Sequence, residues 1–183
     1  MSRPASWRTV SERPLANYRV FEVTELQRQH ADTGQTHTFF RVDSADWANI
    51  IPITTDGQVV MIRQFRHGAA CETLEIPGGL VDEGEDVATA AARELLEETG
   101  YRAGTVLALG SVFPNPALFS NRIHSFVATG CEQVAEIAND ANEETTIELV
   151  PLEDIDWLLR EGKIDHALVM AAFHWWRLRG MPR

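Results

Sequence analysis

Three glutamates stand close together near the middle of the chain, at positions 94, 97 and 98. Their i, i+3, i+4 spacing places Glu94, Glu97 and Glu98 on one face of a helix, within an arc of roughly 100°. Each i, i+4 repulsion costs a few tenths of a kcal/mol, and the helix dipole disfavours anions near a C-terminus. We therefore expect a cation here, and an all-oxygen donor set favours a hard divalent ion, Mg²⁺ above all.

A helix over about residues 86–99 must carry these glutamates. Four alanines between residues 88 and 92 give it high helix propensity, and Gly100 stands where a helix C-terminus takes a left-handed residue. Leu95 and Leu96, with two of the alanines, supply a buried stripe beside the acidic arc, so the glutamates can face a cleft. Before the helix, Pro77-Gly78-Gly79 predicts a loop without regular structure.

The N-terminal part of the chain predicts two strands. Residues 1–16 contain two prolines and are expected to form an irregular lead-in. Residues 18–23 and 37–42 alternate apolar and polar types and are rich in β-branched or aromatic residues, which indicates strands. The polar stretch between them, residues 24–36, is typical of a turn or hairpin loop.

The remaining segments predict a mixed set of strands and helices. An Asp56-Gly57 hairpin signal separates two apolar runs, and an acidic segment over residues 132–144 precedes the last strand. Strands are expected at residues 48–54, 59–65, 73–76, 106–112, 122–128 and 146–150, and helices at 152–161 and 165–179. Strand runs with one central helix and a helical C-terminus predict an α+β fold with a mixed sheet.

Composition excludes several classes of function. The chain has 183 residues and a formal net charge of −11, which argues against binding to nucleic acid or to anionic membranes but not against a phosphate-bearing substrate. Its two cysteines, Cys71 and Cys131, have no metal-type spacing. Without a hydrophobic signal stretch or an apolar run near the ~18 residues of a membrane span, we expect a cytoplasmic protein.

The segment around the glutamates resembles the Nudix box, in which glycine, glutamate, an Arg-Glu pair, a Glu-Glu pair and a final glycine stand at fixed spacings. The matching positions are Gly79, Glu85, Arg93, Glu94, Leu95, Glu97, Glu98, Gly100 and Tyr101. Nine specified positions over 23 residues, from Gly79 to Tyr101, make this a specific motif.

Resemblance to the Nudix hydrolases implies an α/β/α sandwich with a mixed β-sheet, here preceded by a small N-terminal β segment. It implies hydrolysis of a nucleoside diphosphate linked to another moiety, with Mg²⁺ or Mn²⁺. The implied metal ligands are Glu94, Glu97, Glu98 and the backbone carbonyl of Gly78, and Glu97 is also a candidate catalytic residue. A salt bridge between Glu85 and Arg93 would brace the box together with its glycines, Gly79 and Gly100.

Beyond the box, the chain is similar to the ADP-ribose pyrophosphatase branch over about residues 48–178. Pro116 lies sixteen residues after Gly100, as in that branch, and residues 64–66, 75–79 and 161–165 are also similar to it. The branch implies a homodimer, in which a β extension over residues 1–46 is exchanged between partners and residues 47–183 form the Nudix domain. After Pro116 the branch continues with glycine and an acidic residue, whereas Ala117 and Leu118 follow here. The preference for ADP-ribose over another nucleotide sugar is therefore left undecided by the sequence.

Four further residues are candidates for the active site. Glu143 and Glu144 lie in the acidic segment, at positions similar to the branch's mobile catalytic glutamate, or they belong to an ordinary surface loop. Arg66 is a candidate partner of a substrate phosphate, or it is a solvated strand-end charge. Glu75 is a candidate anchor for the terminal ribose or for a water.

The predicted function is Mg²⁺-dependent hydrolysis of the pyrophosphate bond of an ADP-ribose-like nucleoside diphosphate sugar, which yields a nucleoside monophosphate and a sugar phosphate. Two alternatives stay open. One is a Nudix hydrolase for oxidised nucleotides or dinucleoside polyphosphates. The other is a Nudix-like module that binds a nucleotide sugar without hydrolysing it.

Overall fold

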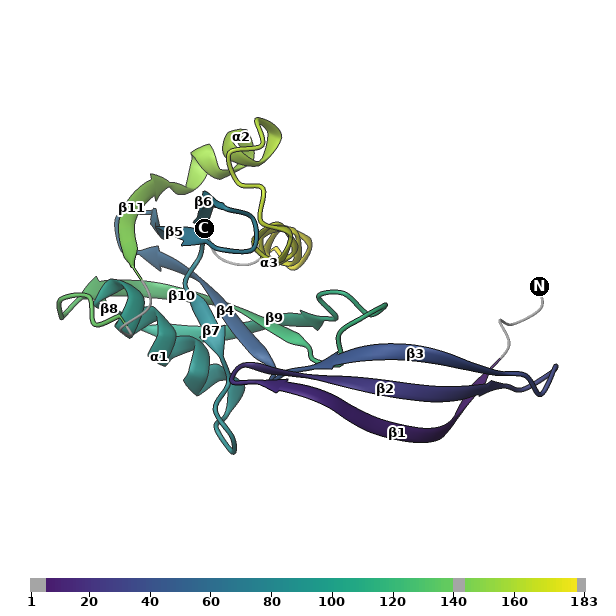
Figure 1. Ribbon diagram of the computed structural model, residues 1–183. Coiled ribbons are helices and arrows are strands. Elements are labelled where there is room, and N and C mark those ends of the chain that lie inside the picture. Colours follow the sequence, from purple (N-terminus) through teal and green to yellow (C-terminus); the bar gives the residue numbers. More distant parts are fainter. Residues whose placement is uncertain (1–5, 140–143, 181–183) are drawn as a thin grey trace. The chain divides into compact units, whose positions relative to one another are not determined.

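The structure is a computed structural model, and it describes residues 6–139 and 144–180. The chain divides into two compact units. The first comprises residues 1–45 together with 113–122, and the second comprises residues 46–112 together with 123–183. Figure 1 shows the elements of each unit.

The first unit contains an antiparallel sheet of three strands in its described residues, ordered β1-β2-β3. These strands are β1 (Trp7–Tyr18), β2 (Phe21–His30) and β3 (Thr36–Asp43). The predicted irregular lead-in is therefore wrong from Trp7 onward, and the predicted turn over residues 24–36 is wrong as far as His30 and again at Thr36. The predicted strand over residues 18–23 is interrupted by the turn that joins β1 to β2.

Two features explain why these strands escaped the sequence pattern. Most of β1 is exposed, so it shows no alternation of buried and polar residues. Its internal proline, Pro14, is tolerated because β1 is an edge strand and its register shifts between Pro14 and Ala16. Polar residues of β2 pair across the strands, as the Arg13–Glu25 ion pair does at 3.1 Å.

The second unit is built on a mixed sheet of eight strands, counted over the described residues. Its central path runs β11-β5-β4-β10-β8, with β6 beside β5, β7 beside β4 and β9 beside β10. The strands are β4 (Trp47–Thr54), β5 (Gln58–Arg66), β6 (Cys71–Glu75), β7 (Gly78–Leu80), β8 (Tyr101–Arg102), β9 (Thr105–Val112), β10 (Ile123–Gln133) and β11 (Thr145–Pro151). Strands β4 and β10 are parallel and the other pairs are antiparallel, so the sheet is mixed, as predicted.

Strand β7 corrects the prediction that Pro77-Gly78-Gly79 forms a loop. Residues Gly78–Leu80 pair with residues Trp47–Asn49 of β4. A Cβ at Gly78 would lie 2.8 Å from the Cα of Asn49, so only glycine lets the two backbones approach this closely. The glycines that indicated a loop are the residues that permit the pairing.

Helices cover both faces of this sheet (Figure 1). They are α1 (Val87–Thr99), the 3₁₀ turn η1 (Leu152–Asp154), α2 (Ile155–Arg160) and α3 (Ala167–Leu178). Apolar residues of α1 pack in one buried cluster with Ile50 and Val60, whereas Phe173 and Trp176 of α3 pack in a second cluster with Ile51 and Met61. The fold is therefore the predicted α+β arrangement of helices on a mixed sheet.

Helix α1 begins and ends close to where the sequence places it. The Asp86 carboxylate caps its first turn by accepting hydrogen bonds from the amides of Ala88 and Thr89. Gly100 ends the helix in the left-handed conformation, with φ of 71°. Over the described residues, none of the helices has the length and apolar character required to cross a membrane.

Candidate active site

The acidic face of α1 packs directly against β7. The Gly78 amide donates a hydrogen bond to Oε2 of Glu98 at 2.8 Å. A Cβ at Gly79 would lie 2.6 Å from Oε1 of Glu94, so the Glu94 carboxylate occupies the space that a side chain at Gly79 would need. Glu94 and Glu98 are only 9% and 3% exposed. The structure therefore buries two of the three predicted carboxylates against the glycine strand.

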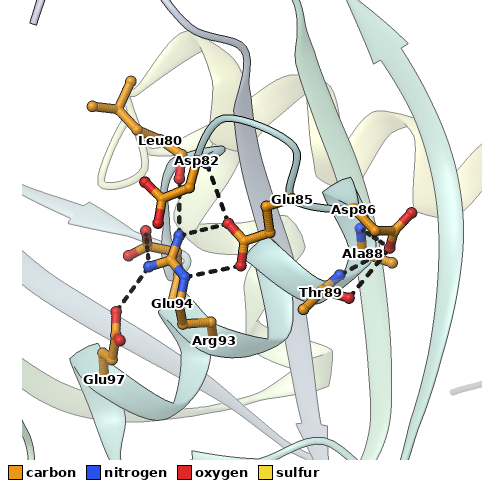
Figure 2. A network of polar contacts seen from close by, with 9 residues as sticks. All are labelled: Leu80, Asp82, Glu85, Asp86, Ala88, Thr89, Arg93, Glu94 and Glu97. Carbon is orange, nitrogen blue, oxygen red and sulfur yellow. Dashed lines mark hydrogen bonds and ion pairs between the residues drawn. The ribbon is translucent and has the colours of Figure 1, made fainter.

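Arg93 gathers the neighbouring charges (Figure 2). Its guanidinium contacts Glu85 at 3.1 Å, Glu94 at 2.8 Å and Glu97 at 2.9 Å, and it donates to the carbonyl of Leu80 at 3.0 Å. The ion pair between Glu85 and Arg93 that the resemblance implies is therefore present. The Glu85 hydrogen bonds raise the pKa of Arg93 despite partial burial, and Arg93 lowers the pKa of Glu85.

Arg93 also neutralises part of the negative charge on the acidic face of α1. The acidic arc was expected to need a cation, and the guanidinium of Arg93 already supplies one to Glu94 and Glu97. The signal was present in the sequence, because Arg93 precedes Glu97 by four residues and so lies on the same helical face. Repulsion between the glutamates alone therefore does not demand a metal.

The chemistry of the donors nevertheless suits a hard divalent ion. Glu94, Glu97 and Glu98 offer carboxylate oxygens. Gly78, whose amide contacts Glu98, also offers a backbone carbonyl oxygen. Among the residues the structure describes, no three His, Cys, Asp or Glu side chains stand at metal-binding spacing, and Arg93 holds two of the three carboxylates. The donor set thus fits Mg²⁺ in its oxygen chemistry, whereas its present geometry serves the ion pairs with Arg93.

Arg66 and Glu75, two of the predicted site residues, form an ion pair with each other. Nε and Nη2 of Arg66 each donate a hydrogen bond of 2.7 Å to the Glu75 carboxylate. Thr73 donates a third at 2.5 Å, and Nε2 of His166 lies 3.7 Å from Glu75. Burial acts to raise the pKa of Glu75, but Arg66, Thr73 and His166 together outweigh it and hold this pKa below its ordinary value.

Sequence reasoning missed Thr73 and His166. A signal for Thr73 existed, because Thr73 and Glu75 are two residues apart on a strand and therefore share one face. Gln64 and Arg66 likewise share the facing side of β5. His166 comes from the N-terminus of α3, about 90 residues away in sequence, and short-range spacing carries no signal for such a pair.

The acidic segment is described in part. Glu143 lies outside the described residues. Glu144 is exposed and directly precedes β11, whose first residue, Thr145, is buried. The hydroxyl of Thr145 donates to the backbone carbonyl of Glu98 at 2.9 Å, which fixes the start of β11 beside the acidic end of α1.

Comparisons with known proteins agree with this fold. The family model described as NUDIX domain matches residues 45–173. An ADP-ribose pyrophosphatase of Bacillus subtilis is 29% identical over 132 residues, which cover 71% of each protein. A methanol dehydrogenase activator of Bacillus methanolicus is 35% identical over 125 residues, 67% of each protein.

A solved structure also matches nearly the whole chain. It is described as the crystal structure of an ADP compounds hydrolase, and it superimposes with a TM-score of 0.84 at 25% identity over 98% of both chains. Fold, box and relatives together define a hydrolase of the pyrophosphatase class. The chain belongs to the Nudix family, as the box predicted.

Proposed function

We propose that this protein hydrolyses the pyrophosphate bond of a nucleoside diphosphate sugar resembling ADP-ribose, with Mg²⁺ and with Mn²⁺ as a substitute. Water adds across the P–O–P linkage, so that one phosphoryl group gains the hydroxyl and the other leaves as a phosphate. The products are a nucleoside monophosphate and a sugar phosphate. The observation that carries the proposal is the placement of Glu94 and Glu98 against the strand of Gly78 and Gly79.

The box residues take separate roles in this proposal. Glu94, Glu97, Glu98 and the Gly78 carbonyl would hold the divalent ion, which when bound neutralises charge on the diphosphate and acidifies a water. The Gly78 amide fixes one carboxylate oxygen of Glu98. Glu97, with a side chain 45% exposed, is the member of the set that can most readily reach solvent and take a proton from the attacking water.

Two acidic-segment residues are alternative proton acceptors. The anchoring of Thr145 beside Glu98 supports a role for Glu144, which precedes it, and Glu143 comes one residue earlier. Replacing each with glutamine in turn and measuring kcat tests this role. If both variants turn over at the wild-type rate, Glu97 is left as the candidate base.

Similarity to relatives supports a nucleotide sugar as the substrate. The relative in Bacillus subtilis bears the name ADP-ribose pyrophosphatase, and an ADP-sugar pyrophosphatase of Mus musculus is 33% identical over 108 residues. Arg66, with a side chain 40% exposed, would contact a phosphate of such a substrate. For Glu75 the buried contacts with Arg66 favour a supporting position over the ribose contact first considered.

A substrate panel tests the function. We would compare kcat/KM for ADP-ribose, ADP-glucose, GDP-mannose, UDP-glucose, an oxidised nucleoside triphosphate and diadenosine tetraphosphate, with and without Mg²⁺. The proposal expects a nucleoside diphosphate sugar to lead and turnover to require the metal. A leading triphosphate or dinucleotide favours the first alternative, and binding without turnover favours a non-catalytic module.

The assembly is proposed to be a homodimer that exchanges the β extension over residues 1–46, with the Nudix domain over residues 47–183. Exposed aromatic side chains on this extension support the proposal, and two pairs of them are in ring contact, Trp7 with Phe39 at 5.3 Å and Tyr18 with Phe21 at 5.1 Å. They are Trp7, Tyr18, Phe21, Phe39 and Phe40. Light scattering should give twice the chain mass of 20.5 kDa. We propose the cytoplasm as the compartment, in keeping with an exposed free thiol at Cys71.

A further inference from the structure

A buried carboxylate that touches three polar side chains, Glu75, lies at the end of strand β6, which pairs with β5. Glu75 is 2% exposed, so a substrate cannot reach it directly. Oε1 accepts hydrogen bonds from Arg66 Nε and Thr73, while Oε2 accepts from Arg66 Nη2 and lies 3.7 Å from His166. Both oxygens are therefore engaged by groups of the protein itself.

Arg66 differs from its partner in exposure. Its side chain is 40% exposed, whereas that of Glu75 is 3% exposed. A bidentate pair fixes both the position and the plane of a guanidinium. Glu75 can therefore hold Arg66 in one orientation, in which the Arg66 side chain remains 40% exposed.

The orientation of β5 places Arg66 on the catalytic face of the sheet. Val60 packs in the same buried cluster as α1, and Gln64 and Arg66 follow it on the same face at even spacing. Gln64 pairs across the sheet with Thr145, whose hydroxyl contacts the carbonyl of Glu98. Arg66 thus stands two residues beyond a position tied to the acidic end of α1.

We propose that Glu75, supported by Thr73 and His166, is a positioning residue that orients Arg66 toward the substrate's diphosphate and does not itself contact substrate. This inference rests on the proposed function. It assigns roles to Thr73 and His166, which would act on binding only through Glu75 and Arg66. Because an oriented guanidinium binds the diphosphate in the ground state as well as in the transition state, loss of orientation should raise KM and leave kcat nearly unchanged.

The test begins with steady-state kinetics on ADP-ribose with Mg²⁺. We expect E75Q to raise KM about 10-fold with kcat within about 2-fold, since a small misplacement of a binding group is enough for such a loss. T73V and H166Q should each raise KM about 3-fold, and T73S, which keeps the hydroxyl, should restore the wild-type value. The matched control is E148Q, which breaks the exposed ion pair of 2.6 Å between Arg63 of β5 and Glu148 of β11 and should change neither constant.

A double-mutant cycle separates positioning from direct contact. If Glu75 acts only through Arg66, adding E75Q to R66Q should not raise KM beyond the value of R66Q alone. An equal rise in both backgrounds would show that Glu75 contacts substrate and would overturn the inference, as would an unchanged KM in E75Q. If the melting temperature shows that E75Q does not fold, the comparison of T73V with T73S decides. A KM that rises in T73V but not in T73S supports the inference, and equal KM values in the two variants overturn it.

The proposed function and the inference fail in different ways. If the wild-type protein turns over ADP-ribose and E75Q matches it, only the inference is overturned. If the wild-type protein neither hydrolyses ADP-ribose nor binds its α,β-methylene analogue in calorimetry, the proposed function fails and the inference falls with it.

Discussion

The carboxylate of Glu94 lies where a side chain at Gly79 would begin. A Cβ at Gly79 would come within 2.6 Å of both Cδ and Oε1 of Glu94. Because the atoms that would clash are the end of a flexible side chain, an added methyl group would displace the carboxylate and not the backbone. The first glycine of the box thus sets the position of a candidate metal ligand.

G79A should therefore impair catalysis more than folding. We expect kcat/KM to fall about 100-fold, the loss associated with a misplacement of about 1 Å, with a melting temperature close to the wild type. The matched control is G68A, because a Cβ at Gly68 meets nothing within 4 Å. An unchanged kcat/KM in G79A would show that the position of Glu94 does not matter for turnover. G78A differs, because its Cβ would meet the backbone of β4, and it should lower the melting temperature.

Glu98 offers a test of the metal site. E98Q keeps an oxygen that can accept from the Gly78 amide at its present 2.8 Å, but it removes the charge. We expect kcat to fall about 100-fold, equivalent to ~2.7 kcal/mol of transition-state stabilisation, and Mg²⁺ to raise the melting temperature of the wild type but not of E98Q. Differential scanning fluorimetry with and without EDTA measures the second effect. Equal Mg²⁺ shifts in both proteins would remove Glu98 from the ligand set.

Local sequence signals were sufficient for the bounds of the central helix, although Leu96, which was expected in its buried stripe, is 38% exposed. Asp86, the alanines and Gly100 each act within one or two turns, and the structure places the helix over Val87–Thr99 as expected. The same holds for the parts of the sheet whose strands are apolar runs. Such segments are predictable because the information that determines them lies inside them.

Other features depend on partners distant in sequence. Strand β1 is exposed along most of its length and forms because β2 lies beside it, so its own pattern gave no alternation. Strand β7 forms only because its backbone approaches β4 closely. Glycine permits this approach, but a glycine in the sequence does not by itself predict it. The contacts of Glu75 join three separate elements, and the His166 contact in particular could not be derived from spacing.

The pH dependence of stability should report on Glu75. Its folded pKa lies below the ordinary value of 4.5, because the contacts with Arg66, Thr73 and His166 outweigh the effect of burial. The unfolded chain therefore binds this proton more readily, and the stabilisation by ionised Glu75 is complete above 4.5 and is lost as pH falls through the folded pKa. The difference in unfolding free energy between wild type and E75Q, from urea titrations, should be constant near neutrality and narrow below pH 4.5. A gap that persists at acid pH would contradict this.

The two cysteines should differ in reactivity. Burial raises the pKa of the Cys131 thiol to about 11, so almost none of it is thiolate at neutral pH. Cys71 is exposed and Cys131 is buried. Titration with a thiol-reactive disulfide should therefore modify one thiol in the native protein and both after denaturation, and C71S should leave the native protein unreactive. Rapid labelling of C71S would show that Cys131 is accessible.

Arg93 and a divalent ion should compensate for one another at the acidic face. R93Q removes the cation that contacts Glu94 and Glu97 at 2.8 and 2.9 Å and leaves the buried Glu94 without that partner. We expect R93Q to lose about 2 kcal/mol of stability without metal, less than for a fully buried pair because Arg93 is partly exposed. Mg²⁺ should then raise the melting temperature of R93Q by more than that of the wild type, since it neutralises carboxylates that Arg93 no longer covers. R13Q, which breaks the surface pair of 3.1 Å with Glu25, is the control and should show the wild-type Mg²⁺ shift. If R93Q and the wild type gain equally from Mg²⁺, then Arg93 and the metal do not share these carboxylates.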